Sequence, residues 1–402
     1  MNFNSGDTAW VLVSASLVLF MTPGLAFFYG GMVRGKNVLG MLAQNFMTMG
    51  VVSVLWIFGV YSLAFSGSGS LLGDLHQFGL NHITQPATGG SADLLNFGAW
   101  TLFAALWLVV VYAPVAHWVF SPSGWLFKLG ALDFAGGTVV HANAGAAALA
   151  IVLVIGNRRG WGKEKMRPHN LPFVLLGAGI LWFGWFGFNA GSALGANQLS
   201  AYAFINTNSA AGAALLGWLL IEKFRDGHAT TLGAASGAVA GLVAITPACG
   251  FVSPVGSIVI GFIAGAVCAL ATKLKDIFKF DDALDVVGVH LVGGVLGALL
   301  IGFFATKTIN PAGADGFLHG GGFALLEKQS LAVAVVLVYS FTATYLLARI
   351  LDKSIGLRVS EYDERRGLDL SEHAESAYER PSISDGSRFI SNFSSNYSKE
   401  NS

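Results

Sequence analysis

The segments DFAGGTVVH (residues 133–141) and DALDVVGVH (residues 282–290) each carry a histidine eight residues after an aspartate. His141 and His290 both lie inside long, glycine-rich apolar stretches. Inserting an ionisable side chain at the centre of a bilayer costs about 2.5–3.5 kcal/mol, so such a residue indicates a functional site. At about 1.5 Å of rise per residue, each histidine lies about 12 Å past its aspartate, near the middle of a hydrocarbon core about 30 Å thick. The two segments therefore predict paired polar groups on a pathway through a membrane.

The composition is typical of a protein that crosses a lipid bilayer many times. Hydrophobic residues make up 54% of the chain, charged residues 11%, and the mean hydropathy is +0.61, far from the values of ordinary soluble domains. The net charge of zero argues against nucleic acid as a partner. The sequence has no Walker loop, HExxH motif, nucleophile elbow or Cys–His cluster, so it favours neither an enzyme nor a metal or cofactor site.

Ten apolar runs are long enough to cross a bilayer as helices. They cover residues 9–31, 39–65, 97–120, 134–156, 170–191, 200–222, 230–248, 255–274, 284–305 and 329–351. Lysine and arginine concentrate in cytoplasmic loops of membrane proteins, and here they cluster at residues 34–36, 158–167, 223–225, 273–279 and 349–366. This pattern predicts an outside N-terminus and a cytoplasmic C-terminus.

The predicted alternation of sides fails before residue 157. If the second run ends outside and the loop 66–96 stays there, the next two runs return the basic loop 157–167 to the outside. The loop 66–96 is a poor candidate for another helix, because it lacks an apolar stretch of about 17 residues, the shortest that spans a bilayer. Either one crossing has been lost from the first half or the topology is unusual.

Internal similarity also indicates a missing helix. Residues 28–31 (FYGG) resemble residues 188–191 (FNAG), and the two Asp–His segments resemble each other. Such a pattern indicates two structural repeats with the site at their interface. Counting the helices that carry the landmarks, five spans run from the first landmark to the second in the second half of the chain, and four in the first half. The predicted fold class is therefore an all-α polytopic membrane protein with pseudo-symmetric five-helix inverted repeats, one helix missing from the first.

Six segments together resemble the ammonium transporter family (Amt/Mep/Rh), of the bacterial type. They are PGLAFFYGGMVRGKNVL (23–39), DFAGGTVVHANAG (133–145), PHNLPFVLLGAGILWFGWFGFNAGSA (168–193), GLVAITPACGFV (241–252), DDALDVVGVHLVGG (281–294) and GLRVSEYDERRGLDLSEHAESAY (356–378). The resemblance implies a homotrimer of eleven-helix protomers in the plasma membrane, the bacterial inner membrane, each with its own pore for ammonium, ammonia or the analogue methylammonium. The sequence departs from the family in lacking the third helix and in carrying a Ser-rich tail.

The resemblance also implies roles for single residues. His141 and His290 resemble the twin histidines of the conduction pore. Phe188 resembles one of two stacked phenylalanines that gate the pore, and the other belongs to the absent helix. The remaining candidates are Phe120, Ser192 and Asp133 for ammonium recruitment, Trp185 and Tyr29 for the pore lining, and Asp282 and Asp285 as structural acids.

The chemistry of the substrate agrees with these residue types. Moving an ammonium-sized ion into a dry interior has an idealised cost of order 20 kcal/mol, whereas a desolvated cation–π contact returns about 2 kcal/mol. We therefore expect NH4+ to lose a proton on the outer side and NH3 to pass beside imidazoles, whose neutral form a dry site favours.

Simpler interpretations of the same residues stay open. Asp133 and Asp282 stand where helix N-caps are common, Phe188 could be packing, and the Ser192 hydroxyl could bond only to backbone. Two other functions also stay open: an ammonium sensor without significant flux, and a non-functional variant lacking one helix.

The chain divides into three regions by composition and resemblance. Residues 1–351 form the predicted transmembrane transporter domain. Residues 352–379 form a cytoplasmic C-terminal regulatory region, and the resemblance implies that it docks on neighbouring protomers and contacts the PII-type signal protein GlnK. Residues 380–402 are polar and Ser-rich, and we expect them to be disordered.

Overall fold

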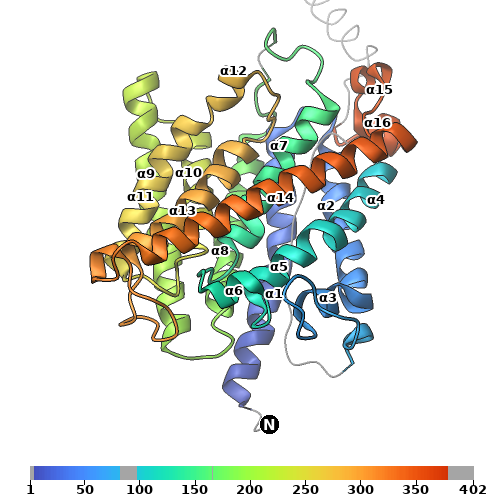
Figure 1. The fold of residues 1–402 in the computed structure, drawn as a ribbon. Coiled ribbons are helices and arrows are strands. Elements are labelled where there is room, and N and C mark those ends of the chain that lie inside the picture. The colour runs from blue at the N-terminus through green and yellow to red at the C-terminus, as the bar shows by residue number, and fades with distance from the viewer. Residues whose placement is uncertain (1–3, 82–96, 165, 379–402) are drawn as a thin grey trace, which may run out of the picture.

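The computed structural model describes residues 4–81, 97–164 and 166–378, so the predicted disordered tail at 380–402 lies outside the described residues. The described residues form a bundle of tilted helices (Figure 1). The α-helices are, in chain order, α1 (Ser5–Met32), α2 (Val38–Leu55), α3 (Tyr61–Phe65), α4 (Phe97–Trp107), α5 (Ala113–Phe120), α6 (Trp125–Leu129), α7 (Asn143–Ile155), α8 (Leu171–Gly191), α9 (Gln198–Asp226), α10 (Thr231–Ile245), α11 (Pro254–Ala271), α12 (Leu274–Phe278), α13 (Val292–Phe304), α14 (Ala324–Ile355), α15 (Glu361–Arg366) and α16 (Leu368–Glu372). The other helical segments are π-helical η1 (Trp56–Val60), η3 (Leu108–Tyr112), η4 (Gly137–Ala142) and η5 (Val287–Leu291), and 3₁₀-helical η2 (Phe78–Leu80) and η6 (Phe317–His319).

The described helices confirm the membrane class. Nine of them, counting segments that continue one another as a single helix, are long and apolar enough to cross a bilayer, and α10 is a shorter apolar helix. These ten segments fall on the ten apolar runs of the sequence. Four runs expected as unbroken helices instead contain a π-helical segment, and η1 is also kinked at Gly59, whose φ is 160°. A run of apolar residues gives no signal for the extra residue of a π-turn.

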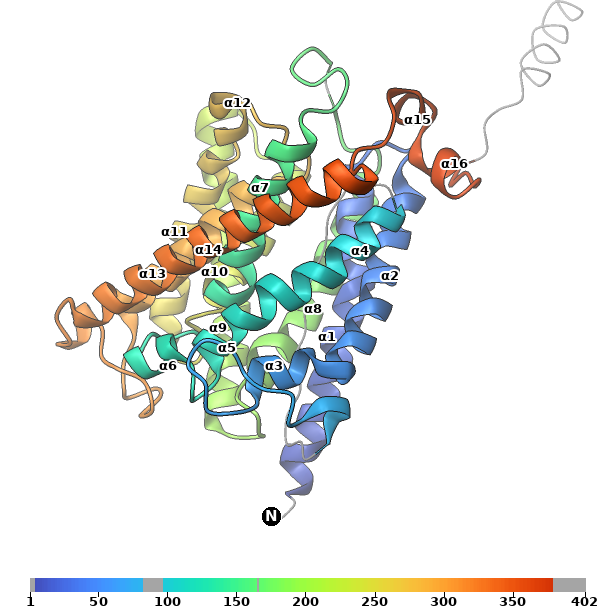
Figure 2. The ribbon, with the colours of Figure 1, turned by 45° about the vertical axis from the view of Figure 1, so that its right-hand side comes forward.

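Charged side chains pair at the end of the bundle opposite the N-terminal end of α1. Figures 1 and 2 show the N-terminal end of α1 at one end of the molecule and α12, α15 and α16 at the other. At this second end Glu364, 3% exposed, accepts hydrogen bonds from the side chains of Arg34 and Arg358 and from the backbone N–H of Arg159. Arg158 pairs with Asp281 at 2.7 Å. The loops after α1 and α7 therefore meet the C-terminal segment, and the loop after α12 meets the loop after α7, as expected if these basic loops share one side of the membrane.

Two helical stretches that follow each other in the described chain run in the same direction. The Trp100 indole N–H donates to the Thr48 hydroxyl at 3.1 Å, near the start of the second stretch and within the first half of the first. The His117 imidazole bonds to Ala64 O at 2.8 Å, near their ends. The stretch α2–η1–α3 is therefore parallel to α4–η3–α5. Phe65, at the end of the first stretch, and the start of α4 therefore lie toward opposite ends of the bundle, and the part of the chain between them is where the sequence predicted a missing crossing.

The repeats are related by inversion. The Trp10 indole N–H donates to Ala190 O, and the Asn170 N–H donates to Gly31 O, so α1 and α8 pack antiparallel along their whole length. The helix formed by η4 and α7 is likewise antiparallel to the helix formed by η5 and α13, because Arg158 after α7 contacts Asp281 before η5. The inverted arrangement of the predicted fold class is therefore confirmed.

Candidate functional site

His141 and His290 come together where two antiparallel helices cross. A β-carbon on Gly145 would lie 2.5 Å from the Leu291 Cα, and one on Gly294 would lie 2.8 Å from the backbone N of Ala142. Only glycine allows such an approach. His141 lies within η4 and His290 within η5, and a π-turn shifts the direction of the side chains that follow it. Small residues and matched π-turns thus bring the two rings to a centroid distance of 5.4 Å.

Each histidine segment begins with a carboxylate that caps it. The Asp133 carboxylate accepts hydrogen bonds of 2.7–3.1 Å from four successive backbone N–H groups, those of residues 136–139. The Asp282 carboxylate accepts from Val286 N at 3.0 Å and Val287 N at 2.8 Å. Both geometries satisfy N–H groups that have no partner within the helix. Asp285 lies near Asp282 with its carboxylate 2.5 Å from Lys275 Nζ, and its role as a structural acid stays a prediction.

A chain of hydrogen bonds links the histidines to a tyrosine. The Tyr29 hydroxyl is 2.8 Å from His290 Nε2, and His290 Nδ1 is 3.4 Å from His141 Nδ1. His141 is 5% exposed, and its Nε2 has no partner among the described residues. This row of hydrogen bonds therefore begins at the buried Tyr29 hydroxyl and ends at the unpartnered Nε2 of His141.

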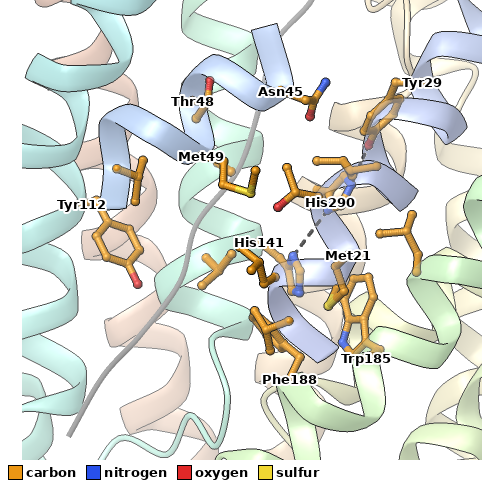
Figure 3. Close-up of a pocket in the computed structure, with 18 of the residues that line it drawn as sticks. Met21, Tyr29, Asn45, Thr48, Met49, Tyr112, His141, Trp185, Phe188 and His290 are labelled. Atoms are coloured by element: carbon orange, nitrogen blue, oxygen red, sulfur yellow. Dashed lines mark hydrogen bonds between the residues drawn. The ribbon is translucent and has the colours of Figure 1, made fainter. Parts of the chain in front are cut away.

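His141 lines a cavity of about 400 Å³. Trp185 stacks on the His141 ring at 5.4 Å, and Phe188 lies 6.3 Å from the same ring. Figure 3 shows both aromatic rings beside His141, with Thr48 and Met49 of α2 across the cavity. The predicted pore residues His141, His290, Phe188, Trp185 and Tyr29 all line this one space.

The predicted recruitment residues lie elsewhere. Phe120 ends α5 and packs in a cluster with α3 and α6, and the Ser192 hydroxyl donates to Phe188 O at 2.8 Å. Neither residue is among those that line the cavity. A combined recruitment site of Phe120, Ser192 and Asp133 stays a prediction.

Several cavity residues were not singled out from the sequence. They are Met21, Asn45, Thr48, Trp56, Trp107 and Tyr112. A signal was present in α2, where Gln44, Asn45 and Thr48 place polar groups inside an otherwise apolar helix. Polar residues within a membrane helix usually face the protein interior. Among the described residues, no group of three or more His, Cys, Asp or Glu could hold a metal ion.

Known proteins share both the sequence and the arrangement. The model of the Ammonium Transporter Family matches residues 9–89 and 83–378. An ammonium transporter of Mycobacterium tuberculosis is 51% identical over 432 aligned positions, which include 94% of this chain and 91% of the relative. An ammonium transporter of Bacillus subtilis is 44% identical, with 93% and 98% covered.

Solved structures agree. The crystal structure of Candida albicans Mep2 superposes with a TM-score of 0.84 at 32% identity, covering 95% of this chain and 92% of that one. A structure of a sensor Amt protein superposes with a TM-score of 0.83 at 29% identity, covering 92% and 98%.

The comparisons also bear on the missing crossing. The family model matches in two separate stretches that overlap at residues 83–89, in the part of the chain between α3 and α4. The alignment of 432 positions is longer than the whole 402-residue chain, so the relative carries residues that this chain lacks. Helix count, site geometry and sequence identity agree, and the chain belongs to the Ammonium Transporter Family.

Proposed function

We propose that this protein carries ammonium across the plasma membrane by releasing a proton on the outer side and passing NH3 along His141 and His290. The observation that carries the proposal is the hydrogen-bonded chain from Tyr29 through the two imidazoles to the free Nε2 of His141 on the cavity wall.

The row of hydrogen bonds from Tyr29 to His141 has two possible proton arrangements. If the Tyr29 hydroxyl donates to His290 Nε2, then His290 Nδ1–H donates to His141 Nδ1, and His141 presents Nε2–H to the cavity. If all three donors reverse, His141 presents a lone pair. A neutral imidazole has one donor and one acceptor, so both arrangements keep the rings uncharged. NH3 can donate and accept, and it can therefore bond to His141 in either state.

The charge of the ion explains why a proton must leave first. Dehydrating an ammonium-sized ion has an idealised cost of order 20 kcal/mol, and the cavity walls around the histidines are largely aromatic and aliphatic. We propose that Phe120 and Ser192 receive NH4+ on the outer side. Asp133 then attracts NH4+ through the electric field of its carboxylate rather than by direct contact, because the carboxylate already accepts hydrogen bonds from four backbone N–H groups.

The assembly and orientation belong to the same proposal. We place the N-terminus outside and the C-terminus in the cytoplasm, because the basic loops gather at the end that carries α15 and α16. We further propose a homotrimer, and a contact of the regulatory region 352–379 with a PII-type protein such as GlnK. The membrane domain is taken as residues 1–351, although α14 continues to Ile355.

Methylammonium uptake in cells without other ammonium transporters tests the proposed function. We expect His141→Leu and His290→Leu each to abolish uptake while the protein still reaches the membrane. His228→Leu is the matched control, because His228 is exposed on a loop, and it should transport like the unsubstituted chain. Unchanged uptake after replacement of both pore histidines would end the proposal.

One observation favours a second candidate, a variant that keeps the site but conducts nothing. Parallel α2 and α4 leave the chain one crossing short. This candidate predicts no uptake and a poor trimer yield for the chain as it stands. Ligand binding and signalling without uptake would instead indicate a sensor.

A further inference from the structure

The buried side chain of Gln329 forms three hydrogen bonds to backbone groups that are distant in the chain. Gln329 is 1% exposed and belongs to α14, which packs against both helices that carry the paired histidines. Its Oε1 accepts from the backbone N–H of Leu132 at 2.6 Å, and its Nε2 donates to Leu132 O at 2.8 Å and to Ala298 O at 2.9 Å. Both N–H groups and the oxygen of the amide are therefore engaged.

The two partners of Gln329 belong to the two different histidine segments. Leu132 lies nine residues before His141, and Ala298 lies in α13, eight residues after His290. Because the two histidine helices are antiparallel, Leu132 and Ala298 lie at the same end of the pair. Leu132 is outside any helix, so its N–H and C=O have no helical partners. One side chain thus bonds to the backbone of both segments.

A second contact of α14 keeps the same register. The buried Ser340 hydroxyl donates to Asn143 O at 2.8 Å. Ser340 follows Gln329 by eleven residues, and Asn143 follows Leu132 by eleven residues, so α14 runs alongside the His141 segment in the same direction. Figure 1 shows α14 running diagonally across the bundle beside α7 and α13. Of these two contacts, only that of Gln329 also reaches α13.

The contact between the imidazoles leaves little room for a shift. His290 Nδ1 and His141 Nδ1 are 3.4 Å apart, whereas hydrogen bonds of N–H groups are usually about 2.7–3.2 Å long. The glycine contacts at Gly145 and Gly294 let the two helices approach but provide no side chain that opposes sliding along the helix axis. Hydrogen bonds are directional, so those of Gln329 do oppose it.

We propose that Gln329 is a positioning residue that sets the spacing of the two imidazoles by bonding to the backbone of both histidine segments. Gln329 is not among the residues that line the cavity, so it acts only through the backbone that it contacts. The inference deepens the proposed function and rests on it, because the spacing of the rings affects transport only if both belong to one pathway.

Solid-state NMR of the full chain in lipid bilayers, labelled with ¹⁵N-histidine, tests the positioning role without transport. A cross peak between the two Nδ1 nuclei reports the contact of the rings, and its absence in His290→Leu assigns it. Gln329→Met removes all three hydrogen bonds and keeps an unbranched side chain. Gln329→Glu is a second variant of nearly the same shape. A carboxyl group carries at most one proton, so it cannot donate to Leu132 O and Ala298 O together.

Thr344→Val is the matched control. Thr344 is also a buried residue of α14, and its hydroxyl accepts from the Trp107 indole N–H at 3.0 Å, a bond in which neither histidine helix takes part. We expect the cross peak to weaken at least threefold in the folded Gln329 variants and to keep its intensity in Thr344→Val. Folding is checked by thermal unfolding in detergent.

Methylammonium uptake, measured in parallel, should fall about tenfold in the Gln329 variants, because a misplacement of about 1 Å can lower the rate of a positioned reaction about 100-fold. Full cross-peak intensity in either folded Gln329 variant would overturn the positioning role. A lost cross peak with unchanged uptake would support the positioning role and would instead exclude the pathway along the two histidines.

Discussion

At the scale of the residue, the Tyr29 hydroxyl fixes the end of the histidine chain. Tyr29→Phe removes the 2.8 Å bond to His290 Nε2 and leaves that nitrogen buried without a partner. Such a bond has a net value of about 0.5–1.5 kcal/mol, so we expect methylammonium uptake to fall by up to about tenfold. Tyr362→Phe, at a side chain that is 69% exposed, is the control. Equal uptake in both variants would exclude Tyr29 from the pathway.

The sequence predicted the paired histidines because their signal is local. A histidine eight residues after an aspartate, repeated in two apolar helices, identifies both the ring and its cap. The choice between N-cap and substrate contact was left open for Asp133. It needed coordinates, because only the folded backbone shows that four N–H groups converge on its carboxylate.

At the scale of the element, the ten apolar runs predicted where helices lie. They did not predict where π-helical segments interrupt these helices, or which face of each helix lines the cavity. The π-turns at η4 and η5 depend on packing between helices far apart in the chain. The same holds for Trp56 and Tyr112, which reach the cavity only because η1 and η3 border it. Hydropathy measures burial in lipid or protein alike, so it cannot identify the face that lines a cavity.

The crossing of the two histidine helices depends on Gly294. A β-carbon there would lie 2.8 Å from Gly137 O and 2.9 Å from the His141 Cβ. We expect Gly294→Ala to separate the helices and lower the free energy of unfolding by about 1–3 kcal/mol. Thermal unfolding in detergent measures this change, and uptake should fall with it.

Gly212→Ala is the control for this substitution. Gly212 also lies in a helix, but a β-carbon there meets nothing within 4 Å. Alanine should therefore be neutral or stabilising at this site. A loss of stability as large as that of Gly294→Ala would show that the helix crossing is not special.

At the scale of the whole molecule, Glu364 ties three distant segments together. Burial favours its neutral form, but the Arg159 N–H and the guanidinium groups of Arg358 and Arg34 hold the pKa of this carboxyl below its ordinary value of 4.5. A lowered folded pKa means that the stabilisation is complete above the ordinary value and is lost as the pH falls through the folded one.

We therefore expect hydrogen exchange in residues 356–378 to be constant between about pH 5 and 8 after correction for the intrinsic rate, and to rise in stronger acid. Glu364→Gln should raise this exchange at pH 7, because it removes the charge and keeps the shape. Glu361→Gln, at a side chain that is 79% exposed, should change nothing. An equal effect of both would show that net charge alone holds the segment.

The parallel course of α2 and α4 determines which loops share a side of the membrane. Simple alternation of the described helices puts residues 68 and 122 on opposite sides, whereas the Trp125 N–H bonded to Ser70 O joins their two loops. We expect an impermeant thiol reagent to label Ser68→Cys and Pro122→Cys, both at exposed positions, in intact cells, and to label Lys163→Cys only in opened membranes. The native cysteines are fully buried and give little background. If Pro122→Cys instead behaves like Lys163→Cys, α2 and α4 do not run parallel in the membrane, and the helices of the first half are assembled in another order.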